Sequence, residues 1–395
     1  MKSQTLASWL IYSFAIGTAV AVPYGANNSG WFDPQKAASR QLSFWQEDLN
    51  LYVSKSLQDR QKAVKDGTAT AGNCTPDKIV YRREWGSMST RDRKNYIDAV
   101  KCLINLPALS SPDEVPGARS RYDDFTAMHI VYSPIIHHSG LFLTWHRYYT
   151  WLYEKALREE CGYKGGQPYW DWTMTWDDLT KSPVFDGSPY SMGSNGKAIP
   201  HGPVNDTALG STRLLNPGTG GGCVEAGPFA NLTINLGPVA LLPAGPNNGM
   251  GYNPRCLHRD FSAEWSHNTK PTDIVDLIKG FTDITSFDLK IEALKGPHAG
   301  GHFGVGGIMA DQYASPSDPV FWLHHGMIDR VWSMWQSRDP KVRIFQTGRT
   351  ITAQDMPPSA NATLETIMPF GMLSTSQKLG DLVSTIDGPF CYQYI

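Results

Sequence analysis

The distribution of histidine is the feature that most constrains the fold of this chain. Eight of the eleven histidines fall into two clusters that lie far apart in the sequence. Their positions are His129, His137, His138 and His146 in the first cluster, and His298, His302, His324 and His325 in the second. A lone histidine is usually an ordinary buried or surface side chain, and we assign that role to His201, His258 and His267. Two dense clusters instead predict that the fold gathers imidazoles for a shared purpose.

The second cluster contains an unfavourable helix sequence. His298 and His302 are four residues apart and would share one helical face, yet Gly300 and Gly301 lie between them. Each glycine weakens a helix by about 1 kcal/mol relative to alanine. A local rule that is broken in this way often marks a functional site. We expect the two glycines to let backbone or substrate approach where a Cβ would intrude.

Histidine clusters of this kind are typical of metal sites. Imidazole ligands without carboxylate or cysteine partners favour copper or zinc. A third histidine from residues 321 to 337 would complete a three-histidine site with an open position, and His129, His137 and either His138 or His146 would form another. Two such sites among four helices can hold a metal pair. A zinc protease is excluded because Ala299 stands where its glutamate would follow the first histidine.

Hydrophobic periodicity predicts a mainly helical chain. The expected helices cover residues 31–66, 91–105, 120–140 with a break at Pro134, 141–162, 274–279, 286–294 and 321–337. From about residue 175 to 254, dense Gly, Pro, Asn and Ser predict long irregular loops. Short β-branched segments follow residue 339. We therefore expect a mainly α fold, with a four-helix bundle core that holds the metal pair, long loops and a few short strands.

The N-terminus has the features of a secretory signal peptide. Lys2 precedes an apolar run from about Leu6 to Val20, and Ala19 and Ala21 form a small-residue cleavage signal. The run is too short to favour a membrane anchor. We expect a signal peptide over residues 1–21, a catalytic domain over residues 22–395, and secretion. The near-neutral net charge of −2 favours a small-molecule ligand over nucleic acid or a membrane surface.

An oxidising compartment would let all six cysteines pair in three disulfides. Proximity in the sequence favours the pairs Cys74–Cys102, Cys223–Cys256 and Cys161–Cys391, among fifteen connectivities that six cysteines allow. Five N-x-S/T sequons predict surface glycosylation, at Asn27, Asn73, Asn205, Asn231 and Asn361.

Two long motifs resemble those of a known family. HHSGLFLTWHRYY, residues 137–149, is similar to the copper A signature of the tyrosinase and catechol oxidase family, and DPVFWLHHGMIDRVW, residues 318–332, to its copper B signature. The resemblance covers about residues 120–340 and is strongest to short secreted fungal polyphenol oxidases. Tyr392-x-Tyr394 resembles the motif that closes the family's core domain. The resemblance implies two copper ions with O2 as co-substrate, and oxidation of o-diphenols to o-quinones while O2 is reduced to water.

The resemblance also assigns ligands by motif position. The implied ligands are His129, His137 and His146 for copper A, and His298, His302 and His325 for copper B. His138 then falls outside the ligand set, and His324 becomes a close neighbour of the second copper ion or of the substrate. Asp329 is expected to orient the ligand His325, with an ordinary ion pair on the helix surface as the alternative.

Alignment with the family also implies a substrate pocket. Its expected residues are Ala299, Phe303, Met309 and Gln312, with Glu292 as the carboxylate that helps a water take the proton of a phenol. A core-packing role for Met309 and a plain surface carboxylate for Glu292 are the alternatives. Many relatives carry asparagine at the position of Ala299, so that water would be poorly held here. The small side chain predicts room for o-aminophenols and some monophenols, with diphenols preferred.

A second departure from the family concerns copper A. Many fungal relatives have a cysteine, cross-linked to a histidine, at the position of Ile135, so packing alone must hold the ligands here. An oxygen carrier with the same dicopper centre is the alternative from another functional class, and a protein with vestigial histidines is a third. The sequence leaves the oligomeric state open.

Overall fold

The structure, a computed structural model, describes residues 33–70, 72–210 and 212–395. The expected signal peptide and the sequon at Asn27 lie outside this range. Pro34–Ile395 form one compact unit. Among the described residues, no helix combines the length and the apolar character needed to cross a bilayer.

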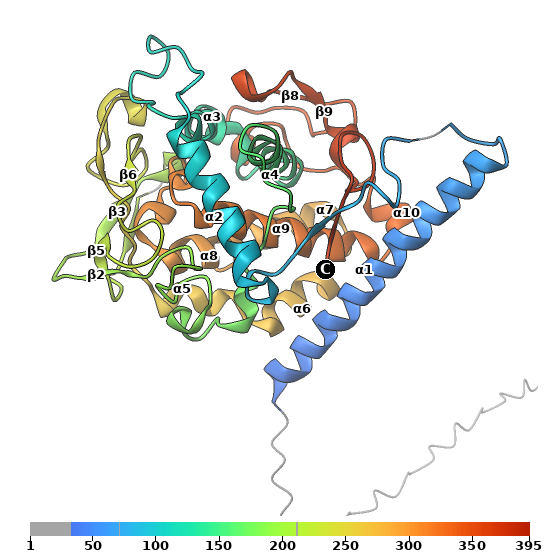
Figure 1. Ribbon diagram of the computed structural model, residues 1–395, viewed down its shortest axis with the longest axis horizontal. Helices are drawn as coiled ribbons and strands as arrows, with labels where there is room; N and C mark the ends of the chain where they lie inside the picture. Colours follow the sequence, from blue (N-terminus) through green and yellow to red (C-terminus); the bar gives the residue numbers. More distant parts are fainter. Residues whose placement is uncertain (1–32, 71, 211) are drawn as a thin grey trace, which may run out of the picture. The chain divides into compact units, whose positions relative to one another are not determined.

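Four helices carry the two histidine clusters and form the centre of the fold (Figure 1). They are α3 (Arg121–Ile136), α4 (Phe142–Glu159), α8 (Pro297–Val305) and α9 (Val320–Ser337). α4 packs against both α3 and α9, and α8 packs against α9. This arrangement confirms the predicted helical core.

Local sequence explains where these helices begin and end. A capping box, in which Ser120 and Asp123 each bond to the other's main-chain N–H, starts α3. Pro297 lies in the first turn of α8, where its missing N–H costs nothing, and Gly306 ends that helix with a φ of 64°. The predicted continuation of α3 to residue 140 is wrong. Pro134 lies in its last turn, and the chain then leaves the helix, with His138 at a φ of 51°.

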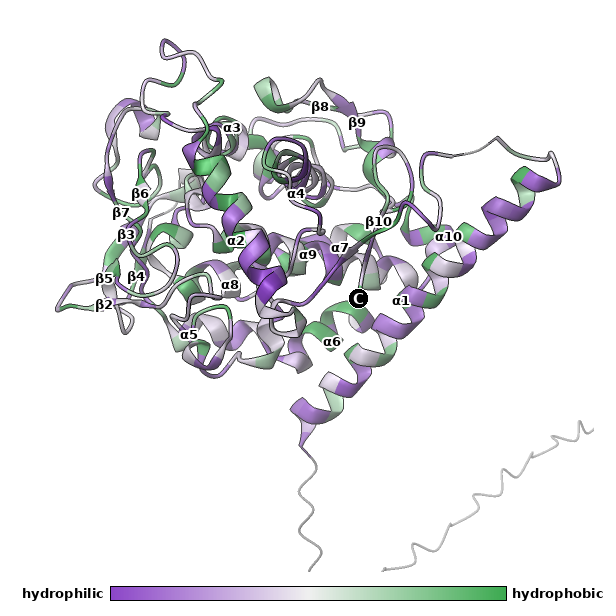
Figure 2. Cartoon of the chain, viewed as in Figure 1, coloured by the Kyte–Doolittle hydropathy of each residue, from purple (hydrophilic) through white to green (hydrophobic). Residues whose placement is uncertain are grey.

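The remaining helices surround the core. They are α1 (Pro34–Lys65), α2 (Thr90–Asn105), α5 (Ala263–Ser266), α6 (Pro271–Gly280), α7 (Ile284–Ile291) and α10 (Pro340–Arg343). α1 packs on α6 and α9, burying a stripe that includes Trp45, Leu49 and Val53, while hydrophilic residues cover much of its remaining surface (Figure 2). α1, α2, α6 and α7 confirm the helices expected from periodicity, within a few residues at each end, whereas the short helices α5 and α10 were not predicted.

The strands of the described residues are short and pair in five two-stranded sheets. They are β1 (Val80–Arg82), β2 (Gly196–Ala198), β3 (Val204–Asp206), β4 (Arg213–Leu215), β5 (Gly221–Val224), β6 (Thr233–Ile234), β7 (Arg255–Cys256), β8 (Ile367–Met368), β9 (Gln377–Lys378) and β10 (Tyr392–Tyr394). The pairs are β1 with β10 in parallel, and β2 with β5, β3 with β4, β6 with β7 and β8 with β9 in antiparallel orientation. Long loops with few short strands were predicted and are confirmed.

Three disulfides form, but only Cys223–Cys256 matches the predicted pairing. The other two are Cys74–Cys391 and Cys102–Cys161, so the pairs based on sequence proximity are wrong. Parallel pairing of β1 with β10 brings the segments that precede these strands together, and each segment supplies one cysteine of the first bond. Separation along the chain carries no information about such a contact.

Candidate metal centre

The first histidine cluster is assembled by α3 and α4. His129 lies on α3, His137 follows its last residue, and His146 lies on α4; all three are buried. One ring nitrogen from each lies within 4.8 Å of the others, and the Nε2 atoms of His129 and His146 are 3.3 Å apart. His138 is not a member of this group. The three side chains that the family motif designates therefore converge.

The second cluster is assembled by α8 and α9. His298 and His302 lie one turn apart on α8, and His324 and His325 are consecutive on α9. Ring nitrogens of all four lie within 4.8 Å of one another, and the Nε2 atoms of His302 and His325 are 3.2 Å apart. This group contains one imidazole more than a three-histidine site requires.

Hydrogen bonds fix which ring nitrogens carry protons. A main-chain carbonyl can only accept, so Nδ1 of His129, His146 and His302 must each donate. The accepting carbonyls belong to Tyr313, Phe142 and Met309, at 2.7, 2.8 and 2.8 Å. A neutral imidazole with a proton on Nδ1 has an unshared electron pair on Nε2. These Nε2 atoms are therefore available as metal ligands.

Burial keeps these imidazoles neutral. Removal from water lowers the pKa of His129 to about 3 and that of His302 to about 4. In the first cluster, the unprotonated Nε2 atoms of His129 and His146 lie 3.3 Å apart, so two electron pairs face each other, and a cation between them relieves the repulsion. The donor set therefore fits a metal ion that prefers imidazole, such as copper.

The extra imidazole of the second cluster is distinguished by its hydrogen bond. The indole N–H of Trp172 donates to Nδ1 of His324 at 3.0 Å. Because Nδ1 accepts, the proton of neutral His324 lies on Nε2, and neither nitrogen offers a free electron pair. This hydrogen bond distinguishes His324 from His298, His302 and His325, the three side chains that the family motif designates. Sequence reasoning missed Trp172, which comes from a distant loop.

The two clusters face each other across one shared space. The rings of His146 and His325 stack with centroids 4.5 Å apart, and those of His137 and His298 stack at 6.0 Å. Phe142 packs against rings of both clusters, at 4.9 Å from His146 and 4.8 Å from His298. One centre with two adjacent three-imidazole sites results.

The glycine pair of α8 makes room for protein rather than for substrate. A Cβ on Gly301 would lie 2.3 Å from ring atoms of His324, and a Cβ on Gly300 would lie 2.9 Å from the side chain of Thr269. Of the two expected neighbours, substrate is wrong and backbone holds in part, because the main chain of Asn268 lies 3.3 Å from the place of a Cβ on Gly300. Gly301 is required because the His324 ring packs directly on the α8 backbone.

A cavity of about 250 Å³ opens beside the imidazoles, and we call it the histidine cavity. His137, His298 and His302 form its inner wall, and the four expected pocket residues line it: Ala299, Phe303, Met309 and Gln312. Nε2 of Gln312 is buried and has no hydrogen-bond partner among the described residues. A ligand with an acceptor oxygen would satisfy this donor.

Sequence reasoning missed six other residues of this cavity. They are Ala208, Arg213, Leu294, Ala310, Gln354 and His138, the last of which had been considered only as a metal ligand. Five of the six come from segments outside the two motifs. A loop residue that reaches a site from a distance has no local pattern that could reveal it.

Glu292 lines the histidine cavity and is buried. Its carboxylate accepts from the main-chain N–H of His138 at 2.7 Å and from Arg349 at 2.5 Å, while Arg349 also reaches Asp288 at 2.7 Å. Burial, and then the nearby Asp288, raise the pKa of Glu292 well above its ordinary value despite the opposing effect of Arg349. Glu292 therefore holds a proton more tightly than an exposed glutamate, beside the space where a ligand would lie.

Asp329 does not bond to His325, whose Nδ1 has no partner among the described side chains and backbone. It accepts instead from Arg147, Tyr392 and Tyr394, each at 2.6 Å, and it is buried. The expected direct orientation of His325 is thus absent, and so is the alternative of a helix-surface pair. Asp329, on α9, is buried and accepts hydrogen bonds from side chains of α4 and β10.

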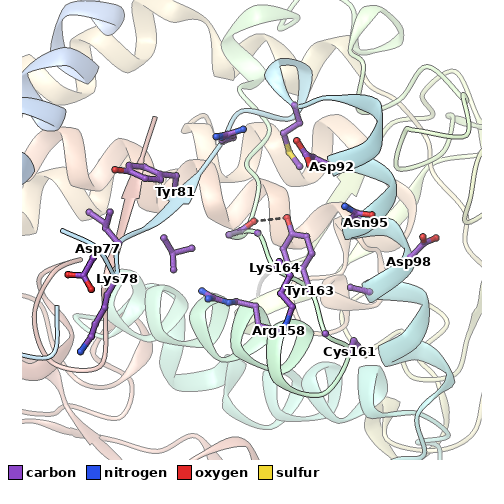
Figure 3. Close-up of a pocket in the computed structure, with 18 residues that line it drawn as sticks. Asp77, Lys78, Tyr81, Asp92, Asn95, Asp98, Arg158, Cys161, Tyr163 and Lys164 are labelled. Atoms are coloured by element: carbon purple, nitrogen blue, oxygen red, sulfur yellow. Dashed lines mark hydrogen bonds between the residues drawn. The ribbon is translucent and has the colours of Figure 1, made fainter. Parts of the chain in front are cut away.

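A larger groove of about 790 Å³ lies elsewhere, beside α2 and β1 (Figure 3). The labelled side chains of its wall mix both charges, including Asp77, Asp92, Lys78 and Arg158. No histidine lines it. His201, His258 and His267 lie outside both metal-binding groups found in the described residues. The chemistry therefore belongs to the histidine cavity, although that cavity is smaller.

Comparison with known proteins identifies the family. Residues 119–338 match the model of the common central domain of tyrosinase. Tyrosinase P of Aspergillus terreus is 43% identical over 342 residues, which cover 83% of this chain and 95% of that protein. The N-acetyl-6-hydroxytryptophan oxidase of Emericella nidulans is 36% identical over 366 residues, covering 87% of this chain and 100% of that protein.

The same relationship appears among solved structures. A mutant polyphenol oxidase from Thermothelomyces thermophila superposes with a TM-score of 0.84 at 40% identity, covering 90% of this chain and 98% of that one. Its likeness extends well beyond the two histidine motifs, to the loops and strands around the helical core. This protein belongs to the tyrosinase family of copper-dependent oxidoreductases that act on small phenols.

Proposed function

We propose that this protein oxidises o-diphenols to o-quinones while reducing O2 to water. Two diphenols lose two electrons and two protons each, and one O2 takes them up to form two molecules of water. The observation that carries the proposal is the opposition of two three-imidazole sites, in which His146 and His325 stack at 4.5 Å. Such a pair of sites is suited to two metal ions that act on one small molecule.

The ligands in this proposal are His129, His137 and His146 for one copper ion, and His298, His302 and His325 for the other. When bound, the copper ions supply O2 binding and electron transfer. The protein keeps the imidazoles neutral by burial and orients His129, His146 and His302 through carbonyl acceptors on Nδ1. Both tasks are complete before substrate arrives.

The phenol ring would lie in the histidine cavity, between Phe303, Met309 and Ala299. Gln312 is placed to donate to a substrate oxygen, since its amide nitrogen has no partner in the described structure. Glu292 would accept a proton from the substrate hydroxyl through water, because burial raises its pKa and because it lines the cavity. Ala299 offers no amide to hold that water, so diphenols, which lose their protons more easily, would be preferred over monophenols.

Oxygen uptake tests the proposal directly. The full-length copper-loaded protein is given 4-tert-butylcatechol, 4-tert-butylphenol and 2-aminophenol, and the initial rates are compared. We expect rapid uptake with the catechol, slower uptake with the aminophenol, and little or delayed uptake with the monophenol. Immediate fast uptake with the monophenol would contradict the preference for diphenols. Reversible O2 binding without oxidation of any of the three would support an oxygen carrier instead.

A further inference from the structure

A second cavity of about 450 Å³ adjoins the histidine cavity, and we call it the side cavity. Phe303 and Ala310 line both cavities and form the wall between them. Phe303 is only half-buried, so this wall reaches the surface of the protein. Ligand pockets usually measure about 300–1,000 Å³. The side cavity falls within that range, whereas the histidine cavity falls below it.

The walls of the side cavity are mainly apolar. They include Val204, Leu215, Leu241, Ile308, Ala314 and Trp265. The ring of Trp265 lies 4.8 Å from that of Phe303, so one side of the cavity is aromatic. Apolar and aromatic walls of this kind favour an apolar or aromatic ligand group.

One strand extends along both cavities. Arg213 of β4 lines the histidine cavity, and Leu215, two residues further along the same strand, lines the side cavity. Residues two apart in a strand point to the same face. The same face of β4 therefore passes from one cavity to the other, and the Arg213 guanidinium lies 5.2 Å from the Phe303 ring at the boundary.

The side cavity also contains a guanidinium that forms no ion pair among the described residues, although its charge interacts with that of Asp311, which lines the same cavity. Arg255 lines it and is half-buried, and its guanidinium donates to two main-chain carbonyls, those of Gly237 at 3.0 Å and Asn253 at 3.1 Å. No ion pair of Arg255 with a carboxylate occurs within the described residues. A partly desolvated guanidinium whose hydrogen bonds go only to main-chain carbonyls is suited to an acceptor oxygen on a ligand, including that of a carboxylate.

We propose that the side cavity binds the distal half of an elongated phenolic substrate whose reacting ring occupies the histidine cavity. The distal half is apolar and ends in an acceptor oxygen, to which the guanidinium of Arg255 donates a hydrogen bond. The molecule crosses the boundary at Phe303, along the face of β4. This inference rests on the proposed function for the identity of the reacting ring. The binding of the distal half rests on the side cavity alone.

Three catechols of increasing length test the inference on the full-length copper-loaded protein. They are 4-methylcatechol, 2-(3,4-dihydroxyphenyl)ethyl benzoate and the matching monoester of terephthalic acid, which adds a terminal carboxylate. We expect kcat/KM for both extended compounds to exceed that for 4-methylcatechol by at least about tenfold, because a second ring is buried. The carboxylate should add a further gain that Arg255→Met removes.

A matched pair of variants on one hairpin locates the effect. Val204→Trp fills the side cavity. The ratio of kcat/KM for an extended catechol to kcat/KM for 4-methylcatechol should then fall to near one. Leu214→Trp changes the same hairpin outside the cavity, where the native side chain is 56% exposed, and should keep the wild-type ratio. Leu215→Trp repeats the filling from β4 if Val204→Trp does not fold. A ratio near one in the wild-type protein, or a ratio unaffected by filling, would overturn the inference.

Binding separates this inference from the proposed function. The phenethyl monoester of terephthalic acid lacks the catechol hydroxyls and cannot be oxidised, so its binding is measured by calorimetry. We expect binding that Val204→Trp weakens by at least about tenfold and Leu214→Trp does not. Such binding in a protein that oxidises no catechol would support the side cavity while refuting the proposed function. Oxidation of 4-methylcatechol without binding of the analogue would do the reverse.

Discussion

Trp172 donates its indole N–H to Nδ1 of His324 at 3.0 Å, and this bond separates two adjacent histidines by role. His324 must carry its remaining proton on Nε2, whereas Nδ1 of His325 has no partner among the described residues. Two neighbours in one motif, equally buried, thus differ in whether a tryptophan N–H occupies a ring nitrogen, and we propose that this decides which of them binds a metal. The sequence letters alone do not contain this distinction.

Copper content should follow that difference. His325→Ala removes a proposed ligand, so copper per chain should fall from about two ions toward one. His324→Ala removes only a neighbour, so copper content should stay near two. Both values come from metal analysis of purified protein. Equal loss in the two variants would show that the hydrogen bond of Trp172 does not decide the ligand.

Gly301 should tolerate no side chain. Gly301→Ala places a Cβ 2.3 Å from the His324 ring, so the ring or the helix must move. We expect a loss of about 1–3 kcal/mol in the free energy of unfolding, as in other overpacked cores. Gly280→Ala, in α6, is the control, because a Cβ there meets nothing within 4 Å. Denaturant unfolding measures both, and an equal effect of the two substitutions would contradict the packing argument.

Arg349 neutralises two buried carboxylates, and its removal should be costly. Arg349→Met leaves Asp288 and Glu292 without their cation, so we expect a loss of about 3–5 kcal/mol in the free energy of unfolding. Arg338→Met breaks the exposed pair with Asp48 and should cost at most about 1 kcal/mol. Similar losses of unfolding free energy in the two variants would show that burial of the Arg349 ion pairs contributes little to stability.

The same cluster predicts a pH dependence. Burial raises the pKa of Asp288 to about 6 from an ordinary 3.8, and Arg349 opposes this rise. An acid that binds its proton more tightly in the folded state stabilises the fold at low pH, and this contribution is lost as pH rises from about 4 to about 6. Asp288→Asn cannot titrate. Its free energy of unfolding should therefore increase relative to wild type between pH 4 and pH 7, and a decrease would contradict the raised pKa.

The sequence is sufficient for the parts of the centre that periodicity and motif spacing describe. His298 and His302 share a face because they are four residues apart, and the long apolar segments around His146 and His325 form helices as expected. These features are local, because residues close together in the sequence determine them. The mainly helical fold follows from the same information.

What the sequence could not provide depends on contacts between distant segments. Cys74 pairs with Cys391 because β1 and β10 lie side by side, which no local pattern records. Asp329 was expected beside His325 because they are one helical turn apart, but the tyrosines of β10 and Arg147 occupy its oxygens. The sequence allowed Gly301 to make room for backbone or substrate, but in the structure the ring of His324 packs against this glycine.

Copper quantification combined with electron paramagnetic resonance of the oxidised protein tests the central claim most directly. If the six imidazoles hold two cupric ions close enough to act on one O2, their unpaired electrons couple. We then expect about two copper ions per chain and almost no resonance signal. One copper ion per chain, or two that give the full signal of isolated cupric ions, would contradict the paired centre.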